Sequence, residues 1–469
     1  MARTLRSRYK KNNFFSKVII GIIFILLIWG MGGRFFQKTD GLRELVDASI
    51  LKNKKISLEV KRINSPKSKI EGYLLEDNTN PIISLNFIFK NAGFASDDHN
   101  KQGLAQMTAL LLTEGAGEYD AEKLKEELEV RAIDISFEAK KDDFEGSLLT
   151  TKNNLKKAIY WLKLMLTSPK LKDDHIKRVK IQLLDAIKRQ KEQPYNELNL
   201  EFAKKIYDKH PYSRNPLGRK EDIEKINVND LRNFIKNSLV KNNLVVGIAG
   251  DIDENEASIL LDEVFGDLPQ SGKINFVRNA DVKFDGSIKT VVRSAGQNIL
   301  LAAMPSVARN HKDFYPLFVA NYIWGGSGLT SKLSQQIREQ EGLTYGIYSY
   351  MELDDKAPLM LVSFSATKEN FIKAKKMLKE ETIKFVKKGI MVEELEKAKN
   401  YLVASYNLRF ASIQNIAQIL TAMQKYDLGL DFLQKRNEYI KQIELKDVND
   451  VIKNYFEIKN MTGVEIGEF

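Results

Sequence analysis

The sequence predicts an α+β protein that contains two similar halves. Residues 82–93 (IISLNFIFKNAG) alternate apolar and polar side chains, as a strand does, and helical spacing dominates the residues that follow. The segment TKNNLKKAIYWLKLML, which begins at Thr151, returns as TKENFIKAKKMLKEET from Thr367. A second pair, HIKRVKIQLLDAI from His175 and ELEKAKNYLVASY from Glu394, follows in the same order. Repeats this far apart indicate duplicated domains rather than a short-period array.

The other elements follow in chain order. Residues 55–63 (KISLEVKRI) alternate and predict a strand. Helical periodicity covers residues 102–113, 121–130, 155–166 and 173–190. The pair Ser168-Pro169 separates the last two of these helices. Residues 244–252 (LVVGIAGDI) are almost continuously apolar and predict a buried strand, whereas residues 266–286 show little periodicity and read as the connection between the halves.

Length and composition limit the classes of protein. A chain of 469 residues allows two to four domains, and 43% hydrophobic residues supply real cores. There is no cysteine, which excludes disulfides, thiolate metal sites and cysteine nucleophiles. The net charge is +11, but six basic residues lie in the first 17, which leaves +5 for the rest. No basic stripe with interleaved aromatics appears, so we expect no nucleic-acid partner.

The N-terminus has the pattern of an export signal. Residues 1–17 are basic and contain no acidic residue, and residues 18–33 (VIIGIIFILLIWGMGG) carry no charge. Sixteen helical residues span roughly 24 Å, which is short for a bilayer core of about 30 Å. Residues 1–33 are therefore a signal peptide or a short signal anchor, and residues 34–54 a tether. We expect an exported chain on the periplasmic side of the inner membrane, anchored through residues 18–33 or released after cleavage.

Three segments resemble the M16 (pitrilysin/insulinase) family, in particular its short two-domain members. They are GGSGLTSKLSQQIREQEGLTYGIYSY (residues 325–350), NAGFASDDHNKQGLAQMTALLLTEGAG (residues 91–117) and PYSRNPLGRKEDIEKI (residues 211–226). The resemblance runs from about residue 55 to the C-terminus.

The resemblance implies a fold and domain boundaries. It predicts two metallohydrolase-like α/β domains, each a mainly antiparallel sheet packed with helices. The first would cover residues 55–268 and the second residues 287–469, with a linker at residues 269–286.

Catalytic members of that family carry H-x-x-E-H on the helix that follows the first loop. Imidazoles at i and i+4 share one helical face and can bind one Zn²⁺, while the glutamate activates the metal-bound water. In this sequence the three positions are Gln106, Ala109 and Leu110. A further glutamate ligand of the family falls at Ala186 or at the neighbouring Asp185. The resemblance therefore predicts a degenerate zinc site, and no metal in this chain.

The histidines offer no substitute. The chain contains His99, His175, His210 and His311, and no two lie within four residues of each other. His99 and Glu114 flank the degenerate helix, but nothing in their spacing brings them together. We expect each histidine to be a surface or loop residue. The sequence also lacks the G-x-S-x-G elbow of serine hydrolases and the spacing of a phosphate-binding loop.

The second half keeps the family's Arg/Tyr pair, at Arg338 and Tyr345. In catalytic complexes of the family this pair lies across the chamber from the zinc and orients the substrate. A guanidinium fork and a phenol hydroxyl are suitable donors to a carbonyl or an oxyanion. Two structural alternatives remain: Arg338 could cap a helix end, and Tyr345 could be an ordinary strand aromatic.

These features together predict a non-catalytic, substrate-binding subunit of a zinc-dependent peptidase heterodimer. The partner would be an M16-type chain that carries H-x-x-E-H and the zinc, and an extended peptide would add a strand to a sheet edge. One alternative is a proteolytically inactive scaffold or binding protein in an envelope assembly. Another is an enzyme with an unrelated site.

Overall fold

The computed structural model describes residues 59–469, which lie within one compact unit. The expected signal segment at residues 1–33 and the tether at residues 34–54 fall outside the described residues. Within residues 59–469, no helix has the length and apolar character needed to cross a bilayer.

The first sheet has six strands. Their order is β1 (Lys61–Asn64), β2 (Glu71–Glu76), β8 (Leu244–Gly250), β3 (Ile82–Phe89), β7 (Phe144–Thr151) and β6 (Asp134–Ala139). The second sheet has five strands, in the order β11 (Gly346–Glu352), β12 (Leu359–Ala366), β10 (Asn298–Pro305), β13 (Thr462–Gly467) and β9 (Ile288–Val292). Strands β4 (Gly115–Ala116) and β5 (Tyr119–Asp120) form a small hairpin. Both large sheets are mixed: β2 pairs with β8 in parallel, β9 pairs with β13 in parallel, and the other pairs are antiparallel.

The two sheets share one topology. If β1 is set aside and the strands of each half are numbered along the chain, both sheets run 1-5-2-4-3. The parallel pair joins the first and last strands in each half. The same order in both halves supports the duplication that the repeats predict.

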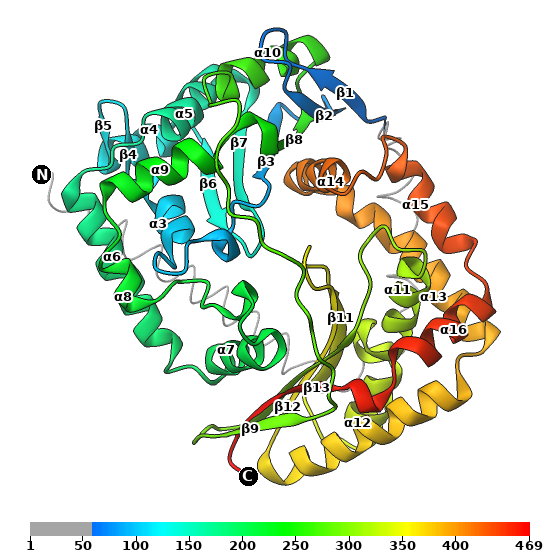
Figure 1. The fold of residues 1–469 in the computed structure, drawn as a ribbon. Helices are drawn as coiled ribbons and strands as arrows, with labels where there is room; N and C mark the ends of the chain where they lie inside the picture. Colours follow the sequence, from blue (N-terminus) through cyan, green and yellow to red (C-terminus); the bar gives the residue numbers. More distant parts are fainter. Residues whose placement is uncertain (1–58) are drawn as a thin grey trace, which may run out of the picture. The chain divides into compact units, whose positions relative to one another are not determined.

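Helices flank the sheets of both halves (Figure 1). In the first half they are α3 (Leu104–Leu111), α4 (Ala121–Val130), α5 (Leu155–Thr167), α6 (Asp173–Gln190), α7 (Pro194–Tyr207), α8 (Lys220–Ile223), α9 (Val228–Ser238) and α10 (Glu254–Phe265). In the second half they are α11 (Phe314–Asn321), α12 (Lys368–Lys388), α13 (Val392–Ala404), α14 (Ile413–Lys425), α15 (Phe432–Lys441) and α16 (Leu445–Tyr455). Two wide π-type turns, Tyr322–Gly326 and Ser334–Gln340, lie between α11 and β11. The helix expected at residues 102–113 is shorter, because Gly103 adopts a left-handed conformation and the helix begins after it.

Each half has its own apolar core. In the first, Phe87 of β3 packs edge-on against Phe265 of α10, with ring centroids 5.1 Å apart. In the second, Trp324 packs edge-on against Phe456, also at 5.1 Å. These four side chains are fully buried.

The two halves exchange a helix. Helix α7, from the first half, places Leu198 and Phe202 in a core with Leu301 and Ile466 of the second sheet. Helix α14, from the second half, packs on β8 and β3 of the first sheet, and Figure 1 shows it beside them. A Cβ at Gly247 of β8 would lie 2.3 Å from the backbone of α14, so only glycine permits this approach. The exchange explains why both halves belong to one compact unit.

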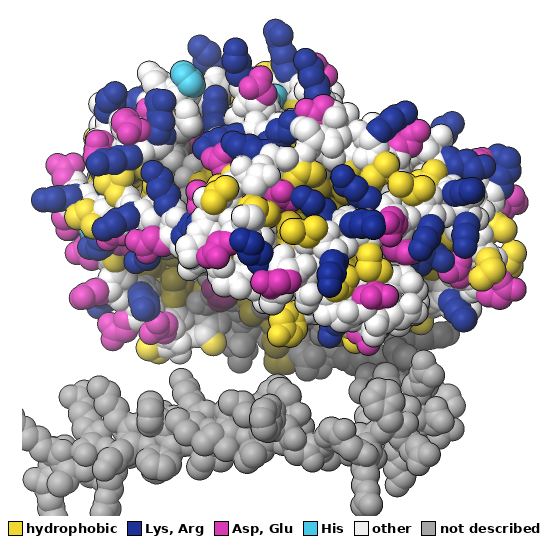
Figure 2. Space-filling model, turned by 90° about the horizontal axis from the view of Figure 1, so that it is seen from below, with side chains coloured by type: hydrophobic (Ala, Val, Ile, Leu, Met, Phe, Trp, Pro, Cys, Tyr) yellow, Lys and Arg dark blue, Asp and Glu magenta, His cyan; other side chains and the backbone are white. Residues whose placement is uncertain are grey.

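One face of the molecule is drawn in Figure 2. Basic and acidic side chains are interspersed over it, with small apolar groups between them. No continuous basic stripe crosses this face.

Candidate functional site

The degenerate helix α3 is held firmly at its start. The buried Asp97 carboxylate accepts hydrogen bonds from the N–H groups of Gly103, at 2.9 Å, and Ala105, at 3.1 Å. These N–H groups would otherwise be unsatisfied at the helix N-terminus. Burial raises the pKa of Asp97 to about 7, while the two backbone donors lower it. Asp97 thus fixes where α3 begins.

A close crossing of two glycines fixes the same helix from the other side. Gly103 has φ of 99° and Gly218 has φ of 90°, both in the left-handed region. A Cβ on Gly218 would lie 2.5 Å from the carbonyl oxygen of Gln102. The segment of residues 211–226, which the sequence singled out, therefore lies directly against the start of α3.

The structure brings the four degenerate metal positions onto two packed helices. Gln106, Ala109 and Leu110 lie on α3, and Ala186 lies on α6, which contacts α3. Gln106, Leu110 and Ala186 are half-buried. Ala109 is only 2% exposed and belongs to the core of the first half. The alternative position, Asp185, is exposed.

Apolar side chains fill the interface between α3 and α6. A cluster contains Met107 and Leu111 of α3 with Val179 and Leu183 of α6, and Leu110 packs against it. An ion placed here would lose its hydration without gaining ligands. The side chains at the family's metal positions therefore do not fit zinc, and within residues 59–469 no three His, Asp or Glu side chains gather into a possible metal site.

The expectation for the histidines is wrong for one of them. His175 is 4% exposed and lies in the first turn of α6 rather than in a loop or on the surface. It shares the apolar face of that helix with Ile176 and Val179. His99 and His311 are exposed loop residues. His210 is held in its loop, because its Nε2 donates to the Arg278 carbonyl at 2.8 Å while its Nδ1 accepts from an N–H.

Glu114, just beyond α3, also has a partner of its own. Its carboxylate forms an ion pair with Arg178 of α6. This pair links the end of α3 to α6, and it means that the Glu114 carboxylate is already engaged in an ion pair.

The Arg/Tyr pair lies in the second half. Arg338 belongs to the π-type turn Ser334–Gln340, and its side chain is 39% exposed. Its Nε lies 3.3 Å from a carboxylate oxygen of the adjacent Glu339. Tyr345 directly precedes β11 and is 79% exposed. Among the described residues no hydrogen bond joins Arg338 to Tyr345, and none involves the Tyr345 hydroxyl.

Hydrogen bonds of Thr344 anchor the backbone beside the exposed Tyr345 side chain. The Thr344 hydroxyl donates to the Ser365 carbonyl at 2.6 Å and accepts from the Gly346 N–H at 3.1 Å. Thr344 is itself buried. Tyr345 is therefore presented to solvent from a fixed position at the start of a strand.

Two more tyrosines continue this exposed surface, and sequence reasoning missed them. Tyr348 and Tyr350 alternate along β11 with the buried Ile347 and Ser349, so they share one face of the strand. They are 48% and 43% exposed. The alternation in YGIYSY was a usable signal. Tyrosine is enriched at binding surfaces because it combines a large apolar ring with a polar tip.

Comparison with known proteins shows similarity to M16-type peptidases and their inactive homologues. Residues 225–402 match the model described as the peptidase M16 inactive domain. A Helicobacter pylori protein named "non-peptidase homolog YmxG" is 29% identical over 406 residues, which span 84% of this chain and 91% of that protein. A Bacillus subtilis protein named "uncharacterized zinc protease YmxG" is 24% identical over 288 residues, 61% of this chain and 68% of that protein.

Solved structures share the fold. A peptidase M16 inactive domain from Pseudomonas fluorescens superposes with a TM-score of 0.81 at 24% identity, over 87% of this chain and 98% of that one. A protease from Helicobacter pylori gives a TM-score of 0.76 at 18% identity, over 87% and 99%. These structural matches show that the chain has the fold of those M16 proteins, and residues 225–402 are similar to the inactive domain of the M16 peptidase family.

Proposed function

We propose that this chain is the non-catalytic, substrate-binding subunit of an M16-type zinc peptidase pair. One observation carries the proposal: Tyr345 is 79% exposed on a rigid strand start and has no partner among the described residues. A large aromatic held in this way is suited to contact another molecule. The metal positions on α3 carry glutamine, alanine and leucine in place of histidine and glutamate, which agrees with a chain that leaves the chemistry to its partner.

Arg338 and Tyr345 would act on a substrate bound to the partner's zinc. Arginine offers a planar fork of N–H donors, and tyrosine offers a directed hydroxyl. Donors fixed in advance stabilise the negative charge that develops on a carbonyl oxygen during peptide hydrolysis. Only the weak contact with Glu339 competes for Arg338 in the described chain.

An extended peptide would bind at β6, the edge strand that contacts α3. The Lys140 N–H donates to the Asp143 carbonyl, so residues 140 and 143 form a hydrogen-bonded pair next to the β6–β7 ladder. This pair shows which residues of β6 direct their N–H groups toward β7. By alternation, the N–H groups of Ile135, Phe137 and Ala139 point away from β7. No backbone hydrogen bond within residues 59–469 uses these outward groups. An added strand would pair with them and read the peptide backbone rather than its sequence.

The proposed partner is an M16-type chain that carries H-x-x-E-H and binds the zinc. The proposed location is the periplasmic side of the inner membrane, because the first 17 residues are basic and residues 18–33 carry no charge. A heterodimer would bring a zinc helix from one chain opposite the Arg/Tyr pair from the other.

Reconstitution with an M16-type chain that carries H-x-x-E-H, sought in the same genome, tests this function. Each chain is purified alone and as a mixture, and cleavage of an unstructured peptide is followed. We expect cleavage by the mixture and by neither chain alone. If the H-x-x-E-H chain alone cleaves as fast as the mixture, the proposed subunit role is wrong.

The relative named a non-peptidase homolog favours a second candidate, an inactive scaffold or binding protein. In that case the two chains would copurify, and replacing Arg338 would leave any cleavage unchanged. The first candidate predicts that the same replacement lowers the rate.

A further inference from the structure

A cavity of about 420 Å³ opens among α11, α14, α15 and the turn Ser405–Phe410. Three arginines line it: Arg309, Arg409 and Arg436. Aromatic and aliphatic side chains complete the wall, among them Phe314, Phe318 and Ile419. No aspartate or glutamate lines the cavity. The site therefore combines concentrated positive charge with an apolar wall.

None of these arginines has a carboxylate partner within residues 59–469. Arg436 is only 8% exposed, and the acceptors of its guanidinium are the Leu402 carbonyl, at 2.7 Å, and the Asn437 amide oxygen, at 2.9 Å. Burial lowers the pKa of Arg436; Tyr406 and Tyr315 oppose this shift, and the charges of Arg409 and Arg309 add to it. A buried charge is normally paired, and the described residues supply no counter-charge to this cluster.

Two buried polar atoms on the wall also lack partners. The Tyr406 hydroxyl and the Arg309 Nε are enclosed, and no hydrogen bond is formed by either atom in the described chain. Tyr406 is 7% exposed, and the Arg436 guanidinium carbon lies 4.3 Å from its ring centre. Each such orphan costs free energy, so its position needs an explanation.

Two of the three arginines, Arg309 and Arg436, are stacked on aromatic rings. The Arg309 guanidinium carbon lies 5.7 Å from the centre of Phe314 and 5.5 Å from that of Tyr426. The Arg436 guanidinium carbon lies 6.0 Å from Phe318 as well. Stacking occupies the guanidinium face and leaves its N–H edge for an anion.

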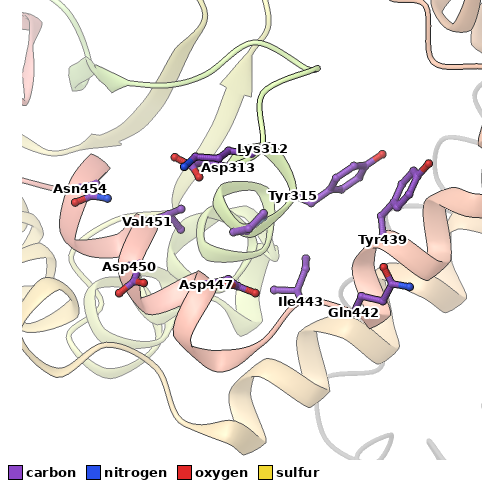
Figure 3. Close-up of a pocket in the computed structure, with 11 residues that line it drawn as sticks. Lys312, Asp313, Tyr315, Tyr439, Gln442, Ile443, Asp447, Asp450, Val451 and Asn454 are labelled. Atoms are coloured by element: carbon purple, nitrogen blue, oxygen red, sulfur yellow. The ribbon is translucent and has the colours of Figure 1, made fainter.

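A second hollow, which shares Tyr315 with this cavity, is lined by acidic side chains instead of arginines. It is lined by Asp313, Asp447 and Asp450 together with Tyr315 and Tyr439, all of which are labelled in Figure 3. Each of these carboxylates has a donor: Asp313 accepts from the Tyr455 hydroxyl, Asp447 caps α16, and Asp450 pairs with Lys446. Within residues 59–469, the carboxylates of the acidic hollow therefore have hydrogen-bond or ion-pair partners, whereas the arginines of the neighbouring cavity have no carboxylate partner.

We propose that the cavity lined by Arg309, Arg409 and Arg436 binds a small organic anion, a carboxylate or phosphate that carries an apolar group. The anionic oxygens would accept from the arginine N–H edges and from the Tyr406 hydroxyl. The apolar group would lie against Phe314, Phe318 and the neighbouring aliphatic side chains. This site is separate from the Arg/Tyr pair and does not depend on the proposed subunit role.

Calorimetric titration of the purified chain in chloride buffer tests the site. Phenyl phosphate and 3-phenylpropionate probe the two anionic chemistries, inorganic phosphate lacks the apolar group, and benzyl alcohol lacks the charge. We expect saturable one-to-one binding of at least one aromatic anion, weaker binding of inorganic phosphate, and none of benzyl alcohol. No saturable binding of either aromatic anion at millimolar concentration would overturn the proposal.

Two variants locate the binding. Arg409 is exposed, so Arg409→Gln should fold normally. Its affinity for the aromatic anion should fall about tenfold or more, because charge-assisted hydrogen bonds are stronger than neutral ones. Arg232→Gln, at another exposed arginine in α9, is the control and should bind like wild type. Tyr406→Phe should weaken binding without lowering the melting temperature, because the hydroxyl has no partner to lose. Equal affinity of Arg409→Gln and Arg232→Gln would place any bound anion elsewhere and refute the site.

Discussion

Lys425, the last residue of α14, forms a buried ion pair with Asp143, which directly precedes β7. Their side chains are 10% and 5% exposed, although 282 residues separate them in the sequence. The Lys425 Nζ also lies 3.0 Å from Asp355. The carboxylates raise the pKa of Lys425 although burial lowers it, so the lysine is held in its charged form. This pair fastens the exchanged helix α14 to the first sheet.

Replacing this lysine should destabilise the whole unit. Lys425→Met leaves Asp143 buried without its counter-charge, which costs roughly 3–5 kcal/mol. Lys435→Met is the matched control, because Lys435 pairs with Asp431 on the surface, where such pairs contribute about 0–1 kcal/mol. The free energy of unfolding from urea titration distinguishes them. Equal effects of the two substitutions would contradict the role of the pair.

Asp97 predicts a pH dependence of stability. Its pKa is about 7 in the folded chain and about 3.9 in an unfolded one. Because the folded value is raised, the contribution of this group is fully present below about pH 4 and is lost as pH rises through about 7. The stability of wild type relative to Asp97→Asn should therefore fall by up to about 1.4 kcal/mol per pH unit between about pH 5 and 7. Asp281→Asn, at an exposed position, should show no such trend, and a flat difference for Asp97→Asn would contradict the assignment.

Because the interface between α3 and α6 is apolar and offers no zinc ligands, the purified chain should hold no stoichiometric zinc. The triple variant Gln106→His, Ala109→Glu and Leu110→His should not acquire zinc either, because Ala186 supplies no further ligand. It should also be less stable by roughly several kcal/mol, since position 109 is 2% exposed and would bury a carboxylate. Elemental analysis and urea titration measure both effects. One zinc per wild-type chain, lost on replacing His99 or Glu114, would overturn this account.

The open edge of β6 predicts how a peptide binds. Phe137→Pro removes one outward N–H, and an edge strand tolerates proline at such a position. Peptide affinity of the chain should fall by about two- to tenfold, the net value of one hydrogen bond. Phe137→Ala removes the same ring but keeps the N–H, so it is the control. Fluorescence anisotropy of a labelled peptide gives both affinities, and indistinguishable values would argue against strand addition at β6.

Local pattern was sufficient for much of the fold. The helices expected at residues 121–130 and 173–190 have those bounds in the structure, because their apolar spacing and charged first turns are local signals. The strand expected at residues 55–63 begins at Lys61 within the described part of the chain. The exchange of α7 and α14 could not be foreseen, because it depends on which sheet face each amphipathic helix reaches in space.

The sites divide in the same way. The non-ligating residues of α3 could be recognised because a metal motif is local in sequence. The arginine cavity could not, because Arg309, Arg409 and Arg436 meet only through the packing of α11, α14 and α15. His175 was misjudged because its burial follows from its neighbours on α6 and not from its own polarity.

The central claim is that this chain completes the active site of a partner. Peptide cleavage by the copurified pair, with wild-type or Arg338→Ala chains at equal occupancy, tests it most directly. Loss of one preorganised donor to an oxyanion lowers turnover by roughly 10²–10³. Because Arg338 is 39% exposed, the variant should still fold and pair, and Arg232→Ala provides the control. We predict a turnover reduced by about this factor for Arg338→Ala alone; equal turnover for Arg338→Ala and wild type would contradict the account.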